Sequence, residues 1–198
     1  MIKNLKQKNK GLTHSIARKA TAEGSTTEGF TLVEALVSIS ILVMAVTGAF
    51  TAAQSGISSS IFSKNQIIAF YLAGEGVEQI RNFRDQNAIN NTADWLQGIA
   101  GIGAGYPCDQ GKVCMIDAVA GSISPCNGVG DTCPNLRLDP VHGFYGYDGT
   151  YASSTIFNRQ IRMTKISNDE WAVSVIVDWS NKGLTRKFEI KENIMNWQ

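Results

Sequence analysis

The sequence predicts an α+β fold in which one long N-terminal helix packs on a C-terminal antiparallel sheet, with a cysteine-containing loop region between them. Three observations lead to this prediction. An apolar run is followed by apolar residues at helical spacing, no proline occurs from residue 30 to residue 106, and the last third alternates between apolar and polar residues. The 198 residues suffice for one such domain and a terminal appendage.

Residues 1–29 are polar and basic. They contain six lysines and arginines against two glutamates, a net charge of +4, so the rest of the chain carries −3 of the total of +1. We interpret this segment as a cytoplasmic leader, because a basic start before an apolar run is typical of targeting segments. The acidic remainder disfavours direct nucleic-acid binding, which needs positive charge on a folded domain.

Residues 30–53 are predicted to form a transmembrane helix. No charged residue occurs between Ala35 and Ala53. As a helix, the run covers about 36 Å, which spans the hydrocarbon core of a bilayer. The preceding lysines are expected to stay in the cytoplasm, so the C-terminal part lies outside. The run is longer than the apolar core of a secretory signal. In such a signal the small residues of the cleavage site follow the apolar core, whereas here the small residue that stands out, Gly29, precedes it.

Residues 54–86 are predicted to continue the helix as an amphipathic half. The separations of its apolar residues are three, four, seven and eight, which places them on one face. This face is formed by Ile57, Ile61, Ile68, Leu72, Ile80 and Phe83. Polar residues such as Asn65 are expected largely on the other faces. One helix from about Phe30 to about Phe83 would therefore be apolar all round in its first half and amphipathic in its second.

Residues 155–198 are predicted to form an antiparallel sheet with three strands in a meander. The apolar faces of the three runs are formed by Phe157, Ile161 and Met163, then by Trp171, Val173, Val175, Val177 and Trp179, and then by Leu184, Phe188 and Ile190. Asn181-Lys-Gly183 is a suitable hairpin turn between the last two runs. A sheet with one apolar face must be covered, and the amphipathic half of the helix supplies that cover.

Residues 87–154, rich in glycine and proline, are interpreted as a variable loop region. The chain's four cysteines, Cys108, Cys114, Cys126 and Cys133, all lie here. An even number in an exported chain favours disulfides, whereas the lack of a C-x-x-C pair disfavours zinc. Of three possible pairings we prefer Cys108–Cys114 with Cys126–Cys133, which would stiffen two local loops more than it stabilises the fold.

A distinctive motif, Glu28-Gly-Phe-Thr-Leu-Val-Glu34, stands at the start of the apolar run. Followed by this run, Gly-Phe-Thr-Leu-x-Glu closely resembles the processing site of type IV prepilins and type II secretion pseudopilins. The resemblance implies a pilin-like fold and a membrane aspartic peptidase, the prepilin peptidase, that cuts after Gly29 and methylates the new N-terminus at Phe30. The mature chain would then be residues 30–198.

Glu34 is the most informative residue of the motif. A carboxylate inside an apolar spanning helix costs several kcal/mol unless it is paired, so such residues are functional by default. The resemblance implies that Glu34 pairs with the positively charged N-terminus of Phe30 in a neighbouring subunit and helps to fix the axial step between subunits. The alternative is that Glu34, about one turn inside the run, reaches the membrane surface.

The resemblance implies a structural subunit, either a minor pilin or a pseudopilin, that is inserted in the inner membrane and then extracted into a cell-surface or periplasmic filament. Its expected partners are prepilin peptidase, other pilin or pseudopilin subunits, the membrane and an inner-membrane assembly platform. No G-x-S-x-G, HExxH or P-loop motif indicates an enzyme, and no cofactor is expected. The alternative function is a monomeric extracellular binding domain that uses the helix only as a signal anchor.

The segment DPVHGFYGYDGTY, residues 139–151, allows two further interpretations. Asp139 and Asp148 could bind calcium, but their spacing is not that of an EF-hand, and a polar turn is preferred. The aromatic residues of the segment could form an adhesive patch, but loop aromatics more often pack on their own domain. These aromatic residues are Phe144, Tyr145, Tyr147 and Tyr151.

Overall fold

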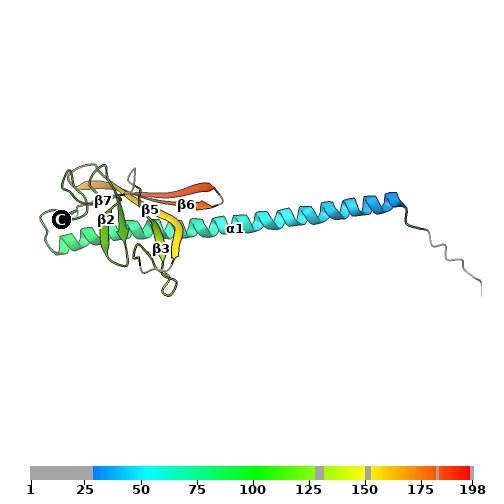
Figure 1. Cartoon of the computed structure of the whole chain (residues 1–198). Coiled ribbons are helices and arrows are strands. Elements are labelled where there is room, and N and C mark those ends of the chain that lie inside the picture. The colour runs from blue at the N-terminus through cyan, green and yellow to red at the C-terminus, as the bar shows by residue number, and fades with distance from the viewer. Residues whose placement is uncertain (1–28, 128–131, 150–152, 182, 197–198) are drawn as a thin grey trace, which may run out of the picture. The chain divides into compact units, whose positions relative to one another are not determined.

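The computed structural model describes residues 29–127, 132–149, 153–181 and 183–196. Except for Gly29, the expected leader lies outside these residues. Within these residues, one helix, α1, is followed by seven strands (Figure 1). The chain divides into two units, Met1–Phe50 and Thr51–Gln198, and each is described by itself.

The described part of the first unit consists of residues 29–50, and from Leu32 onward these belong to α1, whose bounds are Leu32–Ile89. Its large apolar side chains are exposed on all faces of the helix. The hydroxyl groups of Ser40 and Thr47 donate hydrogen bonds to carbonyl groups one turn earlier, at 2.8 and 2.7 Å. These bonds satisfy the two hydroxyl donors locally, which suits a segment without water around it.

In the second unit, the rest of α1 packs on the sheet through small as well as large residues. Its buried residues are Asn65, Ala69, Leu72, Ala73, Gly76, Val77 and Ile80. The prediction of the apolar face was therefore wrong at its start, because Ile57 and Ile61 are 62% and 42% exposed. Both precede Asn65, the first buried residue of the helix, so the sheet does not cover them.

The helix ends six residues later than the predicted Phe83. Asn91 adopts a left-handed conformation with φ of 50°, which asparagine tolerates better than most residues and which ends helices. The side-chain amide of Asn87 donates to the carbonyl oxygens of Trp95 and Gln97, at 3.1 and 3.0 Å. These bonds tie the helix end to the following turn.

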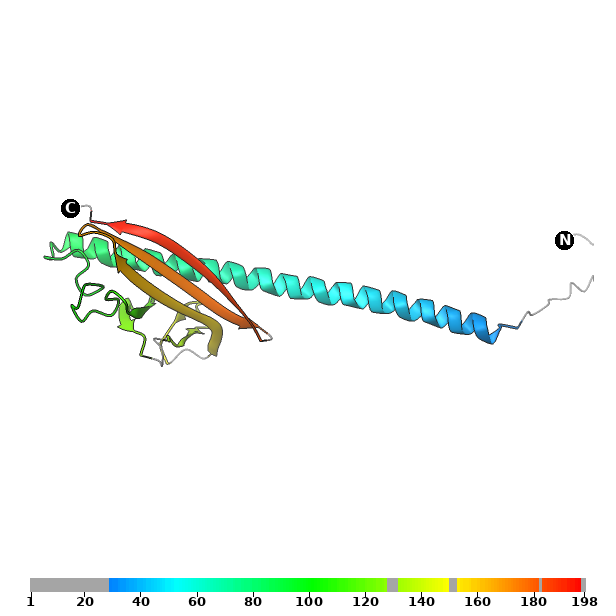
Figure 2. The ribbon, with the colours of Figure 1, turned by 90° about the horizontal axis from the view of Figure 1, so that it is seen from above.

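The predicted meander is confirmed by β5 (Ser153–Lys165), β6 (Glu170–Asn181) and β7 (Leu184–Met195). All pairings are antiparallel, β6 lies between the other two, and Figure 2 shows the three strands alongside the second half of α1. The five predicted residues of β6 are all buried. In β7 the prediction was partly wrong, because Leu184 is exposed and the fully buried residue is Ile194.

Four short strands lie in the region interpreted as loop: β1 (Val113–Asp117), β2 (Ser122–Pro125), β3 (Asn135–Leu138) and β4 (Tyr145–Gly146). Strands β1 and β3 pair with different parts of β5, while β2 pairs with β1 and β4 with β3. The sheet thus has seven strands, and the loop interpretation was wrong for these segments. Strands of two to five residues are too short to show a period of two, and β1 is buried on both faces.

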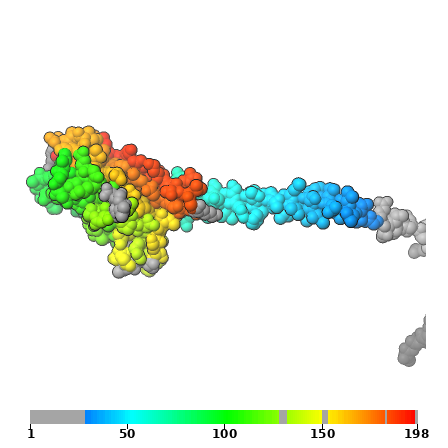
Figure 3. Space-filling view, turned by 45° about the horizontal axis from the view of Figure 1, so that its top comes forward, coloured from blue at the N-terminus to red at the C-terminus, as the bar shows by residue number. Residues whose placement is uncertain are grey.

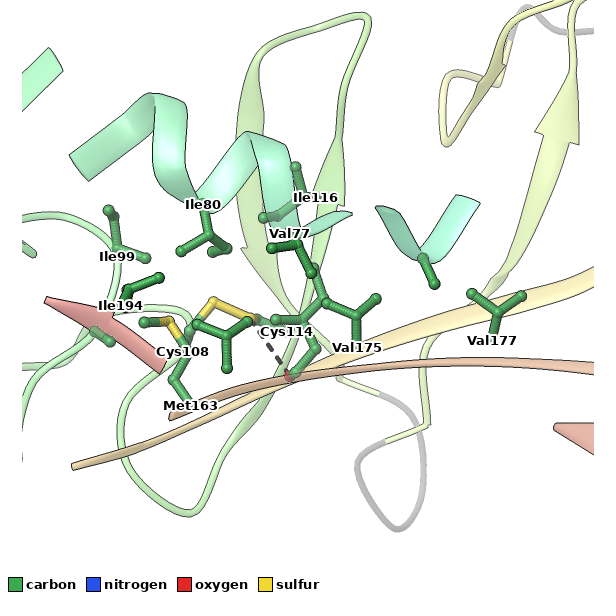
Figure 4. Packing of buried hydrophobic residues seen from close by; sticks show 14 of the residues in the cluster. Val77, Ile80, Ile99, Cys108, Cys114, Ile116, Met163, Val175, Val177 and Ile194 are labelled. Atoms are coloured by element: carbon green, nitrogen blue, oxygen red, sulfur yellow. Dashed lines mark hydrogen bonds between the residues drawn. A yellow bond between two sulfur atoms is a disulfide. The ribbon is translucent and has the colours of Figure 1, made fainter. Parts of the chain in front are cut away.

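The main core lies between α1 and the sheet of the second unit (Figure 4). Val77 and Ile80 of the helix meet Val175 of β6 and Met163 of β5 in this layer. The remaining labelled residues, shown in Figure 4, are Ile99, Cys108, Cys114, Ile116, Val177 and Ile194. The core therefore joins the helix, the meander and the segment that contains the first two cysteines.

Candidate processing and assembly segment

Thr31 caps the start of α1. Its hydroxyl oxygen accepts a hydrogen bond from the backbone N–H of Glu34 at 3.2 Å, and its carbonyl oxygen accepts one from Ala35 at 3.1 Å. Thr-x-x-Glu is also the sequence of a capping box, which satisfies donors that the first turn leaves unpaired. The threonine of the motif therefore fixes the point at which the extended chain becomes helix.

Gly29 and Phe30 lie immediately before this cap, outside the helix. Phe30 is 72% exposed, and a Cβ atom added to Gly29 would meet nothing within 4 Å. Packing within the chain therefore does not require glycine at position 29. A requirement for glycine there would come from a molecule that receives this backbone, such as a peptidase with a narrow site.

Glu34 occupies the first turn of α1 and is exposed. A carboxylate is favourable here because the unpaired N–H groups at the start of a helix carry partial positive charge. Among the described residues, no ion pair neutralises Glu34. The described part of the chain thus supplies a favourable backbone field but no counter-charge.

The helix after Glu34 presents an apolar surface on every side. The large apolar residues from Leu32 to Phe50 are between 53% and 77% exposed. By length and composition this helix can cross a membrane. An apolar surface of this extent needs lipid or protein around it, because water does not tolerate large contiguous apolar patches.

The two disulfides have the preferred pairing. Cys108 is bonded to Cys114 and Cys126 to Cys133, with Cα–Cα distances of 5.1 and 4.7 Å. All four cysteines are buried, and Cys114 lies within β1. The Cys108–Cys114 bond therefore fastens the segment before β1 to the sheet, and the Cys126–Cys133 bond closes the loop between β2 and β3.

Sequence reasoning missed a fully buried arginine, Arg159, in β5. One terminal nitrogen, Nη1, donates to the carbonyl oxygen of Leu72 at 3.0 Å and to the carboxylate of Glu75 at 2.6 Å. The other, Nη2, donates to the carbonyl oxygen of Ile116 at 2.5 Å. Arg159 thus connects α1, β1 and β5. A signal was present, because Arg159 has the same strand parity as the apolar Phe157 and Ile161.

The aromatic segment after β3 packs partly on its own domain. The hydroxyl of Tyr147 donates to the carbonyl oxygen of Arg159 at 3.2 Å, and burial raises the pKa of Tyr147. The backbone N–H of Tyr147 donates to the carboxylate of Asp117 at 2.8 Å. Tyr145 also packs against the core, whereas Phe144 is 53% exposed. Tyr151 lies outside the described residues.

Asp139 forms a turn, as preferred in the sequence interpretation. Its carboxylate accepts hydrogen bonds from the backbone of Val141 at 2.8 Å and lies 2.7 Å from Nδ1 of His142. The contact with His142 lowers the pKa of Asp139. Among the residues that the structure describes, no cluster of three or more histidine, cysteine, aspartate or glutamate side chains is arranged to hold a metal ion.

Comparison with known proteins gives no match to a family model, a curated protein or a solved structure. The fold itself is pilin-like in layout: one long N-terminal helix, an antiparallel sheet, and two disulfides in the region between them.

Proposed function

We propose that this chain is a prepilin-type structural subunit, cut after Gly29 and assembled through residues 30–53 into a type IV pilus-like or type II secretion filament. The observation that carries the proposal is local. An exposed, non-helical Gly29–Phe30 bond lies directly before a capped helix, with Glu34 exposed and without a counter-charge among the described residues. The motif, the apolar helix and the pilin-like layout all agree with this function.

Cleavage would create a positively charged partner for Glu34. Hydrolysis of the Gly29–Phe30 peptide bond consumes one water and leaves a carboxylate on Gly29 and an amine on Phe30. The same peptidase would then transfer a methyl group to that amine from a sulfonium methyl donor, which leaves as a thioether while the amine loses one proton. The methylated amine is again protonated near neutral pH, because α-amino groups titrate near pH 8. Pairing with Glu34 of a neighbouring subunit would neutralise both charges within an apolar filament.

The apolar helix suits both stages of this process. Before assembly it would hold the subunit in the inner membrane, and afterwards it would pack with copies of itself. Lipid tails and a protein interior are similarly apolar, so transfer between them needs no change of surface chemistry. A head-to-tail contact of this kind produces an open helical filament rather than a closed ring. Extraction by an assembly platform and a separate ATPase would supply the energy.

N-terminal sequencing and intact mass of the membrane-fraction chain, with and without prepilin peptidase, test the processing step. We expect a chain that begins at methylated Phe30 only when the peptidase is present. Gly29→Leu should abolish the cut, whereas Gly24→Leu, a matched change outside the motif, should leave it intact. Retention of residues 1–29 under both conditions would favour the monomeric, signal-anchored binding domain.

Incorporation into sheared filaments, in a host with the cognate machinery, tests the role of Glu34. Glu34→Gln keeps the shape of the side chain but removes its charge, and we expect strongly reduced incorporation with normal membrane levels. Glu78→Gln is the matched control, because Glu78 is an exposed helical glutamate beside Arg81. Equal incorporation of both variants would contradict the assembly role of Glu34.

A further inference from the structure

A pocket of about 320 Å³ lies between α1 and the β6–β7 hairpin, within the second unit. In Figure 3 the red residues of this hairpin lie beside the cyan part of α1. Ser55, Ser58, Ser59 and Asn65 line the pocket from the helix, and Trp179 and Arg186 line it from the strands. Its wall thus combines hydroxyl groups, an amide, an aromatic ring and a guanidinium.

The charge of this pocket is positive and uncompensated. Among the described residues, Arg186 is the cationic residue of its lining, and no acidic residue lines it. The guanidinium carbon lies 5.3 Å from the centre of the Phe62 ring, a cation–π contact that holds the side chain at the pocket. Within the described part of the chain, Arg186 makes no ion pair with a carboxylate.

The polar groups of the helix wall are open to solvent and available to a ligand. Across the described residues, no side-chain hydrogen bond engages Ser55, Ser58 or Asn65. Asn65 is only 9% exposed. The side-chain amide of Asn65 is not among the buried polar atoms that lack a partner, so it faces the open pocket, where a ligand can reach it. The hydroxyl and amide N–H groups can all donate to a ligand that accepts hydrogen bonds.

We infer that this pocket binds the oxyanion of a phosphate ester. An oxyanion accepts several hydrogen bonds at once and matches the planar donors of an arginine. A cation is disfavoured because the wall carries a positive charge and no carboxylate. The inference goes beyond the proposed function and does not depend on cleavage after Gly29.

The position of the pocket favours a phospholipid headgroup as the source of the oxyanion. Ser55 is two residues beyond Ala53, where the predicted membrane-spanning run ends. Leu184, at the pocket rim, is 63% exposed. Tryptophan, arginine and exposed apolar residues together are typical of the headgroup region of a membrane. A soluble phosphate ester has the same chemistry and is the other source to be tested.

NMR of the full chain in neutral detergent micelles tests the inference. Two probes are titrated separately: glycerol phosphate, and phosphatidylglycerol against a phosphatidylcholine control. We expect saturable shifts of the Asn65 side-chain amide and the Arg186 guanidinium. Arg186→Gln should weaken binding about tenfold to a hundredfold, the range for a hydrogen bond to a charged group. Arg162→Gln is the matched control, because Arg162 is an exposed strand arginine outside the pocket.

The outcomes distinguish a lipid headgroup from a soluble phosphate ester, and they show whether the pocket binds an oxyanion at all. Saturation by both probes, or by phosphatidylglycerol alone, supports a headgroup site. Saturation by glycerol phosphate alone supports a soluble ester. No saturable shift with either probe overturns the inference, as does equal binding by the Arg186→Gln and Arg162→Gln variants. Asn65→Ala, which removes a side chain without a charge, provides a second test if Arg186→Gln alters the fold.

Discussion

Arg159 and Glu75 form an ion pair, and substitution of either residue should lower the free energy of unfolding by a different amount. Arg159 is fully buried, whereas the side chain of Glu75 is 37% exposed. Arg159→Met leaves a carboxylate that water can reach, and it removes a guanidinium whose Nε has no partner among the described residues. Glu75→Met leaves a positive charge in the core, where the described residues offer it the carbonyl oxygens of Leu72 and Ile116 as acceptors.

The magnitudes follow from this asymmetry. Removal of one partner from a buried pair costs about 3–5 kcal/mol, and the partial exposure of Glu75 reduces this to about 2–4 kcal/mol for Glu75→Met. Arg159→Met loses charged hydrogen bonds but also relieves a desolvated charge, so we expect about 1–2 kcal/mol. The double variant should cost less than the sum of the two, because the residues are in contact.

Urea unfolding of the full chain in micelles, followed by tryptophan fluorescence, measures these costs, since Trp171 and Trp179 are buried in the same core. Arg162→Met, on an exposed position of the same strand, should change the free energy of unfolding by less than about 0.5 kcal/mol. If Arg159→Met were the more destabilising of the two single changes, the reasoning from burial would be refuted.

Two further predictions concern the second unit. Gly76→Ala should lower the free energy of unfolding by about 0.5–2 kcal/mol, because its Cβ would lie 3.0 Å from Cγ1 of Val175 and the overpacking outweighs the gain in helix propensity. The control Gly74→Ala, with nothing within 4 Å, should raise it by about 0.5–1 kcal/mol through helix propensity, and equal effects would contradict this account. The pKa of Asp139, lowered mainly by the hydrogen bond with His142, should rise in His142→Ala, as NMR titration can show. Because the folded pKa is depressed, this contact stabilises the fold above about pH 4, the ordinary aspartate pKa, and is lost as pH falls through the folded value. An unchanged Asp139 pKa in the variant would exclude this contact as the cause.

The sequence predicted the long elements of the fold because their periods repeat many times. Strand β6 carries five alternating apolar residues, and each is buried. The helix signal was weaker, since alanine and glycine residues such as Ala69 and Gly76 do not register as an apolar stripe, although they allow close packing. The buried Asn65 was expected on another face, because polarity alone does not show where a sheet begins to cover a helix.

The candidate site was predictable to a different degree. The motif from Gly29 to Glu34 is contiguous, so its residues could be named from the sequence, and the structure adds the Thr31 cap and the exposure of the bond. The pocket at Arg186 could not be predicted, because its residues come from a helix and a hairpin more than 100 positions apart. Arg159 depends in the same way on carbonyl groups from distant elements.

Arg159 and Glu34 are both charged residues next to apolar ones, but they differ in whether the described residues supply an oppositely charged partner. Arg159 is neutralised and hydrogen-bonded within its own domain, so its burial is explained by folding alone. Glu34 precedes an uncharged apolar stretch that can span a membrane, yet the described residues provide it with no positive partner. A partner from another molecule, or exposure at the membrane surface, would account for it. Cleavage after Gly29 would create a positive charge four residues before Glu34 in every copy of the chain. Each copy could then neutralise the Glu34 carboxylate of a neighbour, and for this reason we favour assembly over exposure at the membrane surface as the role of Glu34.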